Sequence, residues 1–396
     1  MNGMNNTPAH SHSAAGVAVA GAPFPGRRMA SLMQRALFLA EANIGATSPN
    51  PSVGAVIADA DTGEIIASAV TAPGGRPHAE VLALQQAGER ARGSALFTTL
   101  EPCSHFGATP PCANAVAEAG VATVVYGSLD PDTRVAGRGL AWLESHGVTL
   151  LRSEFAKQAD WLNLGHALRV TERRPFVQVK LAVDADGRVP AGGGGQPVWI
   201  TGEAARSQAH LLRARADAIL VGRKTVEADD PELTCRLPGL EDRSPVRVVL
   251  APRCDIPAQA RLFKRQKPPV WIVCGDSSKC GGLPGLPGVK IFDVGASTSG
   301  SLSLRLVLSR LAAEGITRLL VEGGPTTASA FLDAGLADEV IIMQSETRLA
   351  PGSSLPAFAG RGLELVTSSN SYILAARSKA GPDTVHSYRS TAHWQA

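Results

Sequence analysis

The stretch ALFTTLEPCSHFGATPPC (residues 95–112) determines the fold that we predict for the N-terminal half of the chain. Its first six residues have the length and apolar content of a buried strand, and CANAVAEAG (residues 112–120) has the pattern of a short helix. The segment joining them contains Cys103 and ends at Cys112, with eight residues between the two cysteines. Taken alone, the pair is compatible with a disulfide, with one metal site or with two unrelated core thiols.

Strands alternate with helices on both sides of this stretch. Apolar residues at helical spacing predict a helix that begins at residue 29. The predicted strands of this half are residues 53–57, 65–69, 95–100, 121–127 and 148–151, and its further predicted helices are residues 78–92, 112–120 and 139–147. Such alternation is typical of a layered α/β domain, which we expect to end near residue 151.

A linking helix is predicted over residues 154–172, and PFVQVKLAV then opens a second α/β pattern. Its predicted strands are residues 176–183, 217–221, 246–250, 270–274, 289–292, 317–321 and 338–343, and its predicted helices are residues 202–214, 301–313 and 325–334. We therefore predict a disordered tail (residues 1–28), a first domain (29–151), a linking helix (152–174) and a second domain (175–396).

Composition supports two soluble domains in a chain of 396 residues. The net charge of +3 is too small to suggest nucleic-acid binding, and no stretch approaches the roughly 18 apolar residues of a membrane-spanning helix. Residues 14–23 are apolar but short, and no lysine or arginine precedes them, which favours a disordered tail over a signal peptide. We expect a cytoplasmic protein, in which disulfides are rare and paired cysteines more often bind metal.

His78-Ala79-Glu80 provides the partner motif for the two cysteines. The pattern H-x-E followed by P-C and a second cysteine is the signature of zinc nucleobase deaminases, in which the glutamate transfers protons and does not bind the metal. We predict that His78, Cys103 and Cys112 bind Zn²⁺, with Pro111 at the first position of a helix whose first turn holds Cys112. A catalytic zinc keeps one position open for water, so His105 is assigned a pocket or structural role.

The runs NPSVGAVI, HAEVLAL, TLEPCSHFGATPPC and DPDTRVAGRGL together resemble the deaminase half of the bifunctional riboflavin-biosynthesis deaminase/reductase family. In that family a long insert between the cysteines is normal. The resemblance implies a cytidine-deaminase-like three-layer domain, Glu80 as the catalytic acid/base and Asn50 at the wall of the substrate pocket. Ala108 stands where the family has a lysine or arginine that meets the substrate phosphate, so Arg134 and Arg138 become the candidates for that contact.

The second half contains VQVKLAVDADGRV, a long run from VWITGEAARSQ to ELTCR, and LLVEGGPTTASAF, which resemble the reductase half of the same family. Gly323 and Gly324 at a strand–helix junction would by themselves equally suit a tight turn. The resemblance implies a dihydrofolate-reductase-like α/β domain that uses NADPH. It assigns cofactor contacts to Val183, Trp199, Thr225, Asp229, Gly324, Pro325, Thr326, Thr327, Ala328, Ser329 and Ala330, and substrate contacts to Lys180, Arg213, Leu233, Arg236 and Glu322.

Departures from the family pattern are more numerous in this half. Asp184 replaces a serine, Pro197 replaces a polar residue, and Ala251-Pro252 replaces an Asp-Ser pair. A carboxylate at position 184 would repel the phosphates of the cofactor if it lay near them. An alternative is therefore a deaminase whose C-terminal domain has lost reductase activity and serves binding or assembly. A second alternative is a protein-interaction module in which the zinc is structural. Glu80 argues against it, because a structural zinc site needs no free carboxylate.

The function expected from these features is bifunctional. Zinc-dependent hydrolytic deamination of 2,5-diamino-6-ribosylamino-4(3H)-pyrimidinone 5′-phosphate is followed by NADPH-dependent reduction of the ribosyl to the ribityl side chain. Either Lys180 or Glu322 assists the proton transfer in the reduction. The expected partners are the small phosphorylated pyrimidine substrate and further copies of the chain in a homo-oligomer, with no nucleic acid and no membrane.

Overall fold

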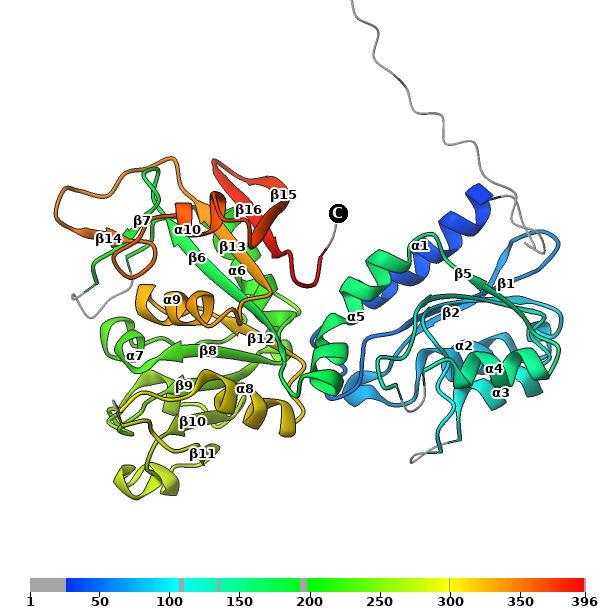
Figure 1. Ribbon diagram of the computed structural model, residues 1–396, viewed down its shortest axis with the longest axis horizontal. Helices are drawn as coiled ribbons and strands as arrows, with labels where there is room; N and C mark the ends of the chain where they lie inside the picture. Colours follow the sequence, from blue (N-terminus) through cyan, green and yellow to red (C-terminus); the bar gives the residue numbers. More distant parts are fainter. Residues whose placement is uncertain (1–25, 107–109, 134–135, 193–197, 299, 395–396) are drawn as a thin grey trace, which may run out of the picture.

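Two sheets divide the molecule into two lobes, and a long helix, α5 (Ala156–Thr171), lies where the lobes meet (Figure 1). The computed structural model describes residues 26–106, 110–133, 136–192, 198–298 and 300–394. Residues 1–25 of the predicted tail, Ala108, Arg134 and Pro197 lie outside these ranges. Among the helices of the described ranges, none is both long and apolar enough to cross a lipid bilayer.

The N-terminal lobe is built on a five-stranded sheet with strand order β2-β1-β3-β4-β5. The strands are β1 (Gly54–Ala58), β2 (Ile65–Val70), β3 (Ala95–Leu100), β4 (Thr123–Ser128) and β5 (Thr149–Arg152). Strand β1 pairs antiparallel with β2 and β3, whereas β3, β4 and β5 run parallel. Every residue of β3 is buried, including Thr98 and Thr99, so its sequence shows no alternation of apolar and polar residues.

Helices cover both faces of this sheet and give the three layers predicted. Helix α1 (Gly26–Ala42) packs with α5 on one face, where Met33 and Phe97 belong to one apolar cluster. The other face carries α2 (Ala79–Ala87), α3 (Cys112–Glu118) and α4 (Arg138–Ser145). Helix α2 ends five residues before the predicted end, because Gly88 turns to φ +56° and only a short 3-10 turn follows.

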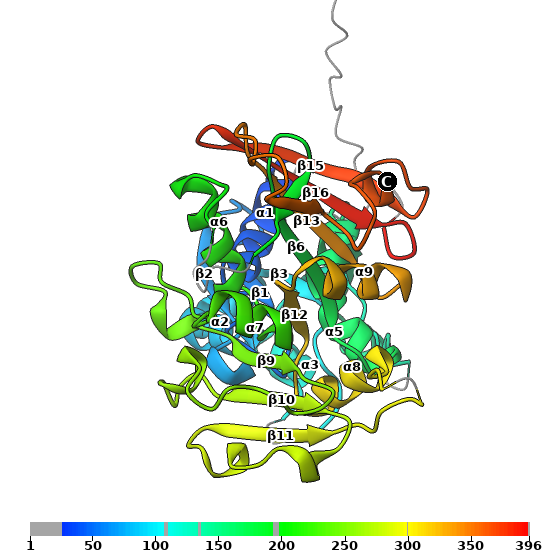
Figure 2. The same cartoon turned by 90° about the vertical axis from the view of Figure 1, so that its left-hand side faces the viewer.

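The C-terminal lobe contains a nine-stranded sheet with order β11-β10-β9-β8-β12-β6-β13-β16-β15 (Figure 2). Its strands are β6 (Phe176–Val183), β8 (Ala218–Gly222), β9 (Val246–Leu250), β10 (Val270–Cys274), β11 (Val289–Asp293), β12 (Arg318–Val321), β13 (Glu339–Gln344), β15 (Tyr372–Ala380) and β16 (Asp383–Ser390). The first seven strands of that order are parallel, and β16 and β15 extend the sheet in antiparallel fashion. A two-stranded sheet pairs β7 (Arg188–Pro190) with β14 (Ser354–Pro356).

Helices again lie on both faces of the larger sheet. Helices α8 (Leu304–Ala313) and α9 (Pro325–Asp333) bury their apolar residues in the main core cluster on one face. Helices α6 (Glu203–Ala214) and α7 (Arg223–Asp229) pack on the other face, and α10 (Glu364–Thr367) precedes β15. The seven predicted strands lie within one residue of those observed, because apolar residues dominate each run, although β11 at the edge of the sheet is only partly buried.

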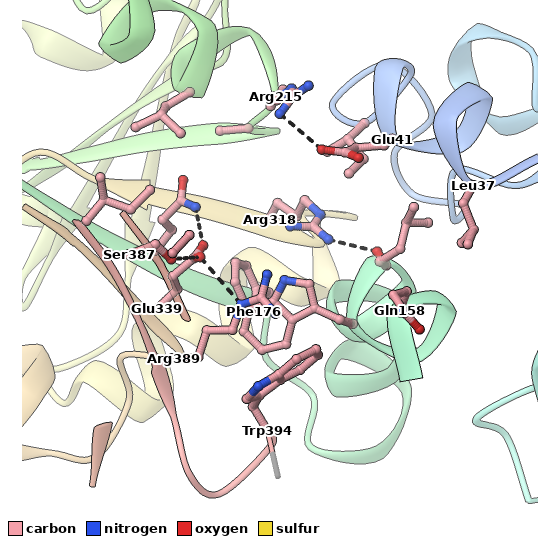
Figure 3. A pocket seen from close by; sticks show the side chains of 18 of the residues that line it. Leu37, Glu41, Gln158, Phe176, Arg215, Arg318, Glu339, Ser387, Arg389 and Trp394 are labelled. Carbon is pink, nitrogen blue, oxygen red and sulfur yellow. Dashed lines mark hydrogen bonds and ion pairs between the residues drawn. The ribbon is translucent and has the colours of Figure 1, made fainter. Parts of the chain in front are cut away.

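The junction between the lobes encloses a cavity of about 650 Å³ between α1, α5 and the larger sheet (Figure 3). Its charged groups are already engaged. The Arg389 guanidinium lies 4.0 Å and 4.2 Å from the ring centres of Trp161 and Trp394. Arg215 pairs with Glu41 at 3.6 Å, and Arg318 donates to the carbonyl oxygen of Leu162 at 2.7 Å. These contacts connect the two lobes around the cavity, and we call this zone of contact the seam.

A disulfide corrects the expectation that the cysteines stay reduced. Cys254 and Cys280 are bonded, with their Cα atoms 4.9 Å apart. Both side chains are buried in the apolar cluster beneath α7, together with Cys274. Sequence spacing could not predict this pair, since the two cysteines lie 26 positions apart and meet only through packing of the loops after β9 and β10.

Candidate active sites

Three elements bring the predicted metal ligands together. His78 immediately precedes α2, Cys103 follows β3, and Cys112 is the first residue of α3. The His78 Nδ1 atom lies 3.2 Å from Cys112 Sγ and 3.6 Å from Cys103 Sγ. All three ligand atoms lie within 4.8 Å of one another. One nitrogen and two sulfur donors at these separations fit a zinc ion with bonds of about 2.0–2.3 Å and a position left for water.

Local geometry holds the two thiols in place. The Cys112 N–H donates to Cys103 Sγ at 3.3 Å, and the Ala113 N–H donates to the Cys103 carbonyl oxygen at 3.1 Å. Pro111 caps α3, one position before the predicted one, so Cys112 still occupies the first helical turn. The hydrogen bond with Cys112 lowers the pKa of Cys103 to about 4, which favours the thiolate that a metal requires.

Glu80 lies beside these ligands in the first turn of α2. Its side chain is only 3% exposed, and Oε2 has no hydrogen-bond partner among the described residues. Burial raises the pKa of Glu80 to about 7, and the Cys103 thiolate adds to the rise. A buried carboxylate that has one oxygen without a hydrogen bond and changes protonation near neutral pH suits proton transfer.

A cavity of about 530 Å³ opens onto His78, Glu80 and Cys103. Asn50, His105 and Arg138 line it, as the sequence predicted for a substrate pocket. Asn50 is fixed by a hydrogen bond from Nδ2 to the Gly75 carbonyl oxygen at 2.8 Å.

Sequence reasoning missed other residues that line this cavity, namely Arg76, Glu101, Asp130, Asp132, His166 and Val170. Asp130 and Asp132 stand in the DPDTRVAGRGL run, so their motif was a usable signal. His166 and Val170 belong to α5, and their position depends on how the linking helix docks. Burial lowers the pKa of His166 to about 4, which keeps this imidazole neutral at pH 7.

The second cavity, of about 250 Å³, lies in the C-terminal lobe. It is lined by many of the predicted residues, namely Lys180, Trp199, Arg213, Thr225, Asp229, Arg236, Glu322, Gly324 and Pro325. Gly324 caps α9, and its N–H donates to Thr225 Oγ at 3.3 Å. The strand–helix junction after β12 thus faces this cavity, as a cofactor cradle requires.

A buried ion pair dominates the electrostatics of the second cavity. Arg213 holds Glu322 with two hydrogen bonds of 2.8 Å and 2.9 Å, and donates a third, of 3.0 Å, to the Thr234 carbonyl oxygen. Burial alone would raise the pKa of Glu322, but the Arg213 guanidinium lowers it to about 2. Burial lowers the pKa of Lys180, an effect that Glu322 opposes and Arg213 reinforces.

The remaining predicted cofactor and substrate residues do not line this cavity. Val183 and Ala328 are buried in the main core, and Leu233 is buried near α7 with φ +57°. Ser329 Oγ accepts the Ala359 N–H at 2.7 Å. Thr327 packs against Gly323, and Thr326 and Ala330 are exposed. Because residues 325–333 form a helix, successive side chains turn away from the cavity, and only the start of the motif reaches it.

The structure also places the residues that departed from the family pattern. Both oxygens of Asp184 accept backbone N–H groups, those of Asp186 and Arg188 on one oxygen and that of Leu349 on the other. Asp184 is 1% exposed and does not line the cavity, so its carboxylate serves the surrounding backbone, and repulsion of the cofactor by it stays a prediction. Ala251 is buried, and the Pro252 carbonyl oxygen accepts the Gly275 N–H at 3.1 Å.

Helix α6 contributes two polar residues to this cavity that sequence reasoning missed, Arg206 and His210. The Arg206 guanidinium lies 5.3 Å from the ring centre of Trp199, and His210 Nδ1 accepts the Arg236 N–H at 3.2 Å. Their spacing from Arg213, seven and three residues, places all three on one helix face, and this periodicity was a usable signal.

Comparisons with known proteins identify both domains. Residues 27–128 match the model of the cytidine and deoxycytidylate deaminase zinc-binding region, and residues 175–347 match that of the RibD C-terminal domain. The riboflavin biosynthesis protein RibD of Aquifex aeolicus is 35% identical over 332 residues, covering 84% of this chain and 91% of that protein. The Escherichia coli protein of that name is 38% identical over 321 residues, covering 78% of this chain and 85% of its own length.

Solved structures give the same result. Acinetobacter baumannii RibD is similar with a TM-score of 0.79 and 32% identity, covering 92% of this chain and 99% of that one. A Thermotoga maritima diaminohydroxyphosphoribosylaminopyrimidine deaminase/5-amino-6-(5-phosphoribosylamino)uracil reductase matches with the same TM-score, identity and coverage. With its zinc ligands, its reductase domain and relatives that match it over most of their length, the chain belongs to the RibD family of bifunctional deaminase/reductase enzymes of riboflavin biosynthesis.

Proposed function

We propose that the N-terminal site deaminates 2,5-diamino-6-ribosylamino-4(3H)-pyrimidinone 5′-phosphate, and that the C-terminal site then reduces the ribosyl group of the product with NADPH. The single observation that carries the first step is the buried Glu80, whose Oε2 has no hydrogen-bond partner among the described residues, beside the ligand set of His78, Cys103 and Cys112. The second step is supported by the cavity of Lys180, Glu322 and Gly324 in the reductase domain.

In the deamination, His78, Cys103 and Cys112 would hold the zinc ion. When bound, zinc makes hydroxide available at neutral pH by lowering the pKa of water to about 7. Glu80 takes up a proton as the nucleophile adds to the ring carbon that bears the amine, and passes protons to the ring nitrogen and the departing ammonia. Asn50 hydrogen-bonds the pyrimidine, and its fixed amide limits which ring orientations fit.

Phosphate recognition in the deaminase site falls to Arg138. This arginine is the first residue of α4 and lines the zinc cavity. A guanidinium pairs with phosphate oxygens and keeps its charge at every physiological pH. Arg138 thereby substitutes for the basic side chain that the family has at the position of Ala108, which lies outside the described residues.

In the reduction, the side chains of the second cavity divide into two tasks. Glu322 is bound to Arg213 and its pKa is about 2, so it remains ionised and cannot donate a proton. Lys180 is the amine of this cavity, burial lowers its pKa, and we assign it the proton transfer that accompanies hydride delivery. Arg236 binds the substrate phosphate, while Arg213 adds charge and keeps Glu322 in place.

The deciding assay supplies the phosphorylated diaminopyrimidinone and NADPH to the purified protein and measures ammonia and NADPH separately. Both are expected to change, with ammonia release first. Ammonia release without NADPH oxidation, even when deaminated substrate is added directly, would favour a deaminase whose second domain only binds or assembles. Removal of zinc by a chelator is expected to stop ammonia release and to leave reduction of the deaminated substrate intact.

The assembly, localisation and partners of the enzyme are also part of the proposal. We expect a homo-oligomer in the cytoplasm, with the small phosphorylated pyrimidine as its partner and neither nucleic acid nor membrane. The small net charge of +3 supports the absence of a polyanionic partner. Light scattering of the purified chain tests the assembly, and a mass equal to that of the 41.0 kDa monomer would contradict it.

A further inference from the structure

A second buried carboxylate lies near the zinc ligands and has no part in the proton transfers. Glu101 follows β3 and is 3% exposed. Its Oε2 accepts the N–H groups of Asp130 at 3.1 Å and Gly137 at 2.9 Å, and its Oε1 accepts the N–H of Gly139 at 3.0 Å. Unlike Glu80, Glu101 therefore uses both oxygens to hold backbone.

The backbone that Glu101 holds carries one wall of the deaminase cavity. Asp130, Asp132 and Arg138 all line that cavity, and all lie within or beside the segment bonded to Glu101. Helix α4 begins at Arg138 after Gly137, which has φ +73° and no side chain to cap the helix. Helix N-termini leave N–H groups that need acceptors, and the Glu101 carboxylate supplies one from another part of the chain.

Gly139 shows how closely the two segments approach. A Cβ atom at this position would lie 2.0 Å from the Pro102 carbonyl oxygen and 3.2 Å from Glu101 Oε1. No side chain fits there without moving the first turn of α4 away from the segment that contains Cys103. We call the contact of Glu101 with the start of α4 the clamp. It depends on two features that can be changed separately, the carboxylate of Glu101 and the absence of a side chain at Gly139.

We propose that Glu101 is a positioning residue of the deaminase. By binding three backbone N–H groups, it fixes the wall of Asp130, Asp132 and Arg138 at a set position relative to the zinc ligand Cys103. The substrate is then held at its polar end while its ring faces Glu80. The inference rests on the proposed deaminase site, and it assigns Glu101 to substrate binding through the wall, not to the chemical step.

The test uses Glu101→Gln and Gly139→Ala in the full chain. Charge-assisted hydrogen bonds contribute enough that losing them should raise the deaminase KM for the phosphorylated diaminopyrimidinone about tenfold. The deaminase kcat, the zinc content and NADPH oxidation on deaminated substrate should stay near their wild-type values. Asp59→Asn is the matched control, because Asp59 also accepts backbone N–H groups, those of Asp61 and Thr62, but in an exposed turn.

A rise in KM in Gly139→Ala alone, should Glu101→Gln fail to fold, still supports the proposal because this variant keeps the carboxylate. Unchanged KM values, or loss of zinc together with kcat in Gly139→Ala, would overturn it, since the clamp would then be dispensable or would serve only the metal segment. Absence of ammonia release from the wild-type protein would instead overturn the proposed function, so the two failures are distinguishable.

Discussion

Two carboxylates of the deaminase domain differ in task because their oxygens meet different groups. Glu80 retains an oxygen without a partner among the described residues, in an interior that raises its pKa to about 7, whereas both oxygens of Glu101 accept backbone N–H groups. The sequence alone separated Glu80 through the H-x-E motif, whose chemistry demands fixed residue types. It could not single out Glu101, since its partners lie some 30 positions away and meet it only in the fold.

Arg138 provides a prediction at the scale of one residue. Arg138→Ala should raise the deaminase KM for the phosphorylated substrate about tenfold or more, because one charged contact to phosphate is lost. The kcat should change little, and Arg138→Lys should recover part of the loss. Steady-state ammonia release checks this, with an unphosphorylated analogue as the control. An equal KM in wild type and Arg138→Ala would mean that another group binds the phosphate.

Lys180 gives the reductase a predictable pH dependence. Burial lowers its pKa below the usual 10.5, so the protonated form that donates to substrate is lost as pH rises through this lowered value. The kcat for NADPH oxidation should therefore fall on the alkaline side, below pH 10.5. Lys180→Arg keeps the charge but holds its proton too tightly, so we expect kcat to drop about 100-fold or more and the alkaline fall to disappear. An unchanged alkaline fall in this variant would remove Lys180 from the proton transfer.

At the scale of elements, the sequence predicted the strands with apolar cores, but it did not predict the β15–β16 hairpin at the edge of the larger sheet. The predicted strands coincide with observed ones because each contains several apolar residues, most of which are buried in the core. Strand β15 is exposed over most of its length and β16 is half-buried, so their sequences lack that signal and the hairpin was missed. Helix α7 was also missed, since seven mostly polar residues show little periodicity.

The connection between α5 and the larger sheet depends on one buried ion pair. Arg174 donates to both oxygens of Asp338 at 2.8 Å and 2.9 Å, and Asp338 also accepts the Val177 N–H at 2.8 Å. Asp338→Asn removes one of the two carboxylates paired with Arg174, the other being that of Glu172 at 2.7 Å, and should lower the free energy of unfolding by about 2 kcal/mol.

Urea unfolding measures this change. The matched control is Asp333→Asn, which removes the exposed pair of Asp333 with Arg361 and should cost at most about 1 kcal/mol. Equal losses in the two variants would show that burial of the Arg174–Asp338 pair contributes nothing to the junction.

At the scale of the whole molecule, the linking helix belongs to both lobes. His166 and Val170 of α5 line the deaminase cavity, while Gly165 of the same helix lies close to the Thr317 carbonyl oxygen of the reductase domain. Gly45 approaches Ala214 in the same close manner across the seam. A fragment ending at residue 151, the predicted domain boundary, would therefore lack one wall of the deaminase site. Domain docking of this kind has no local sequence signal, which is why the wall was not predicted.

The central claim is that two separate sites act in sequence on one substrate, and Glu80→Gln tests it most directly. With the phosphorylated diaminopyrimidinone and NADPH supplied together, this variant should release ammonia about 100-fold or more slowly than wild type and should oxidise NADPH no faster than it releases ammonia. It should retain the zinc content of the wild type, and should oxidise NADPH at the wild-type rate when given deaminated substrate. Wild-type ammonia release by Glu80→Gln, or failure to oxidise NADPH on the deaminated substrate, would contradict the account.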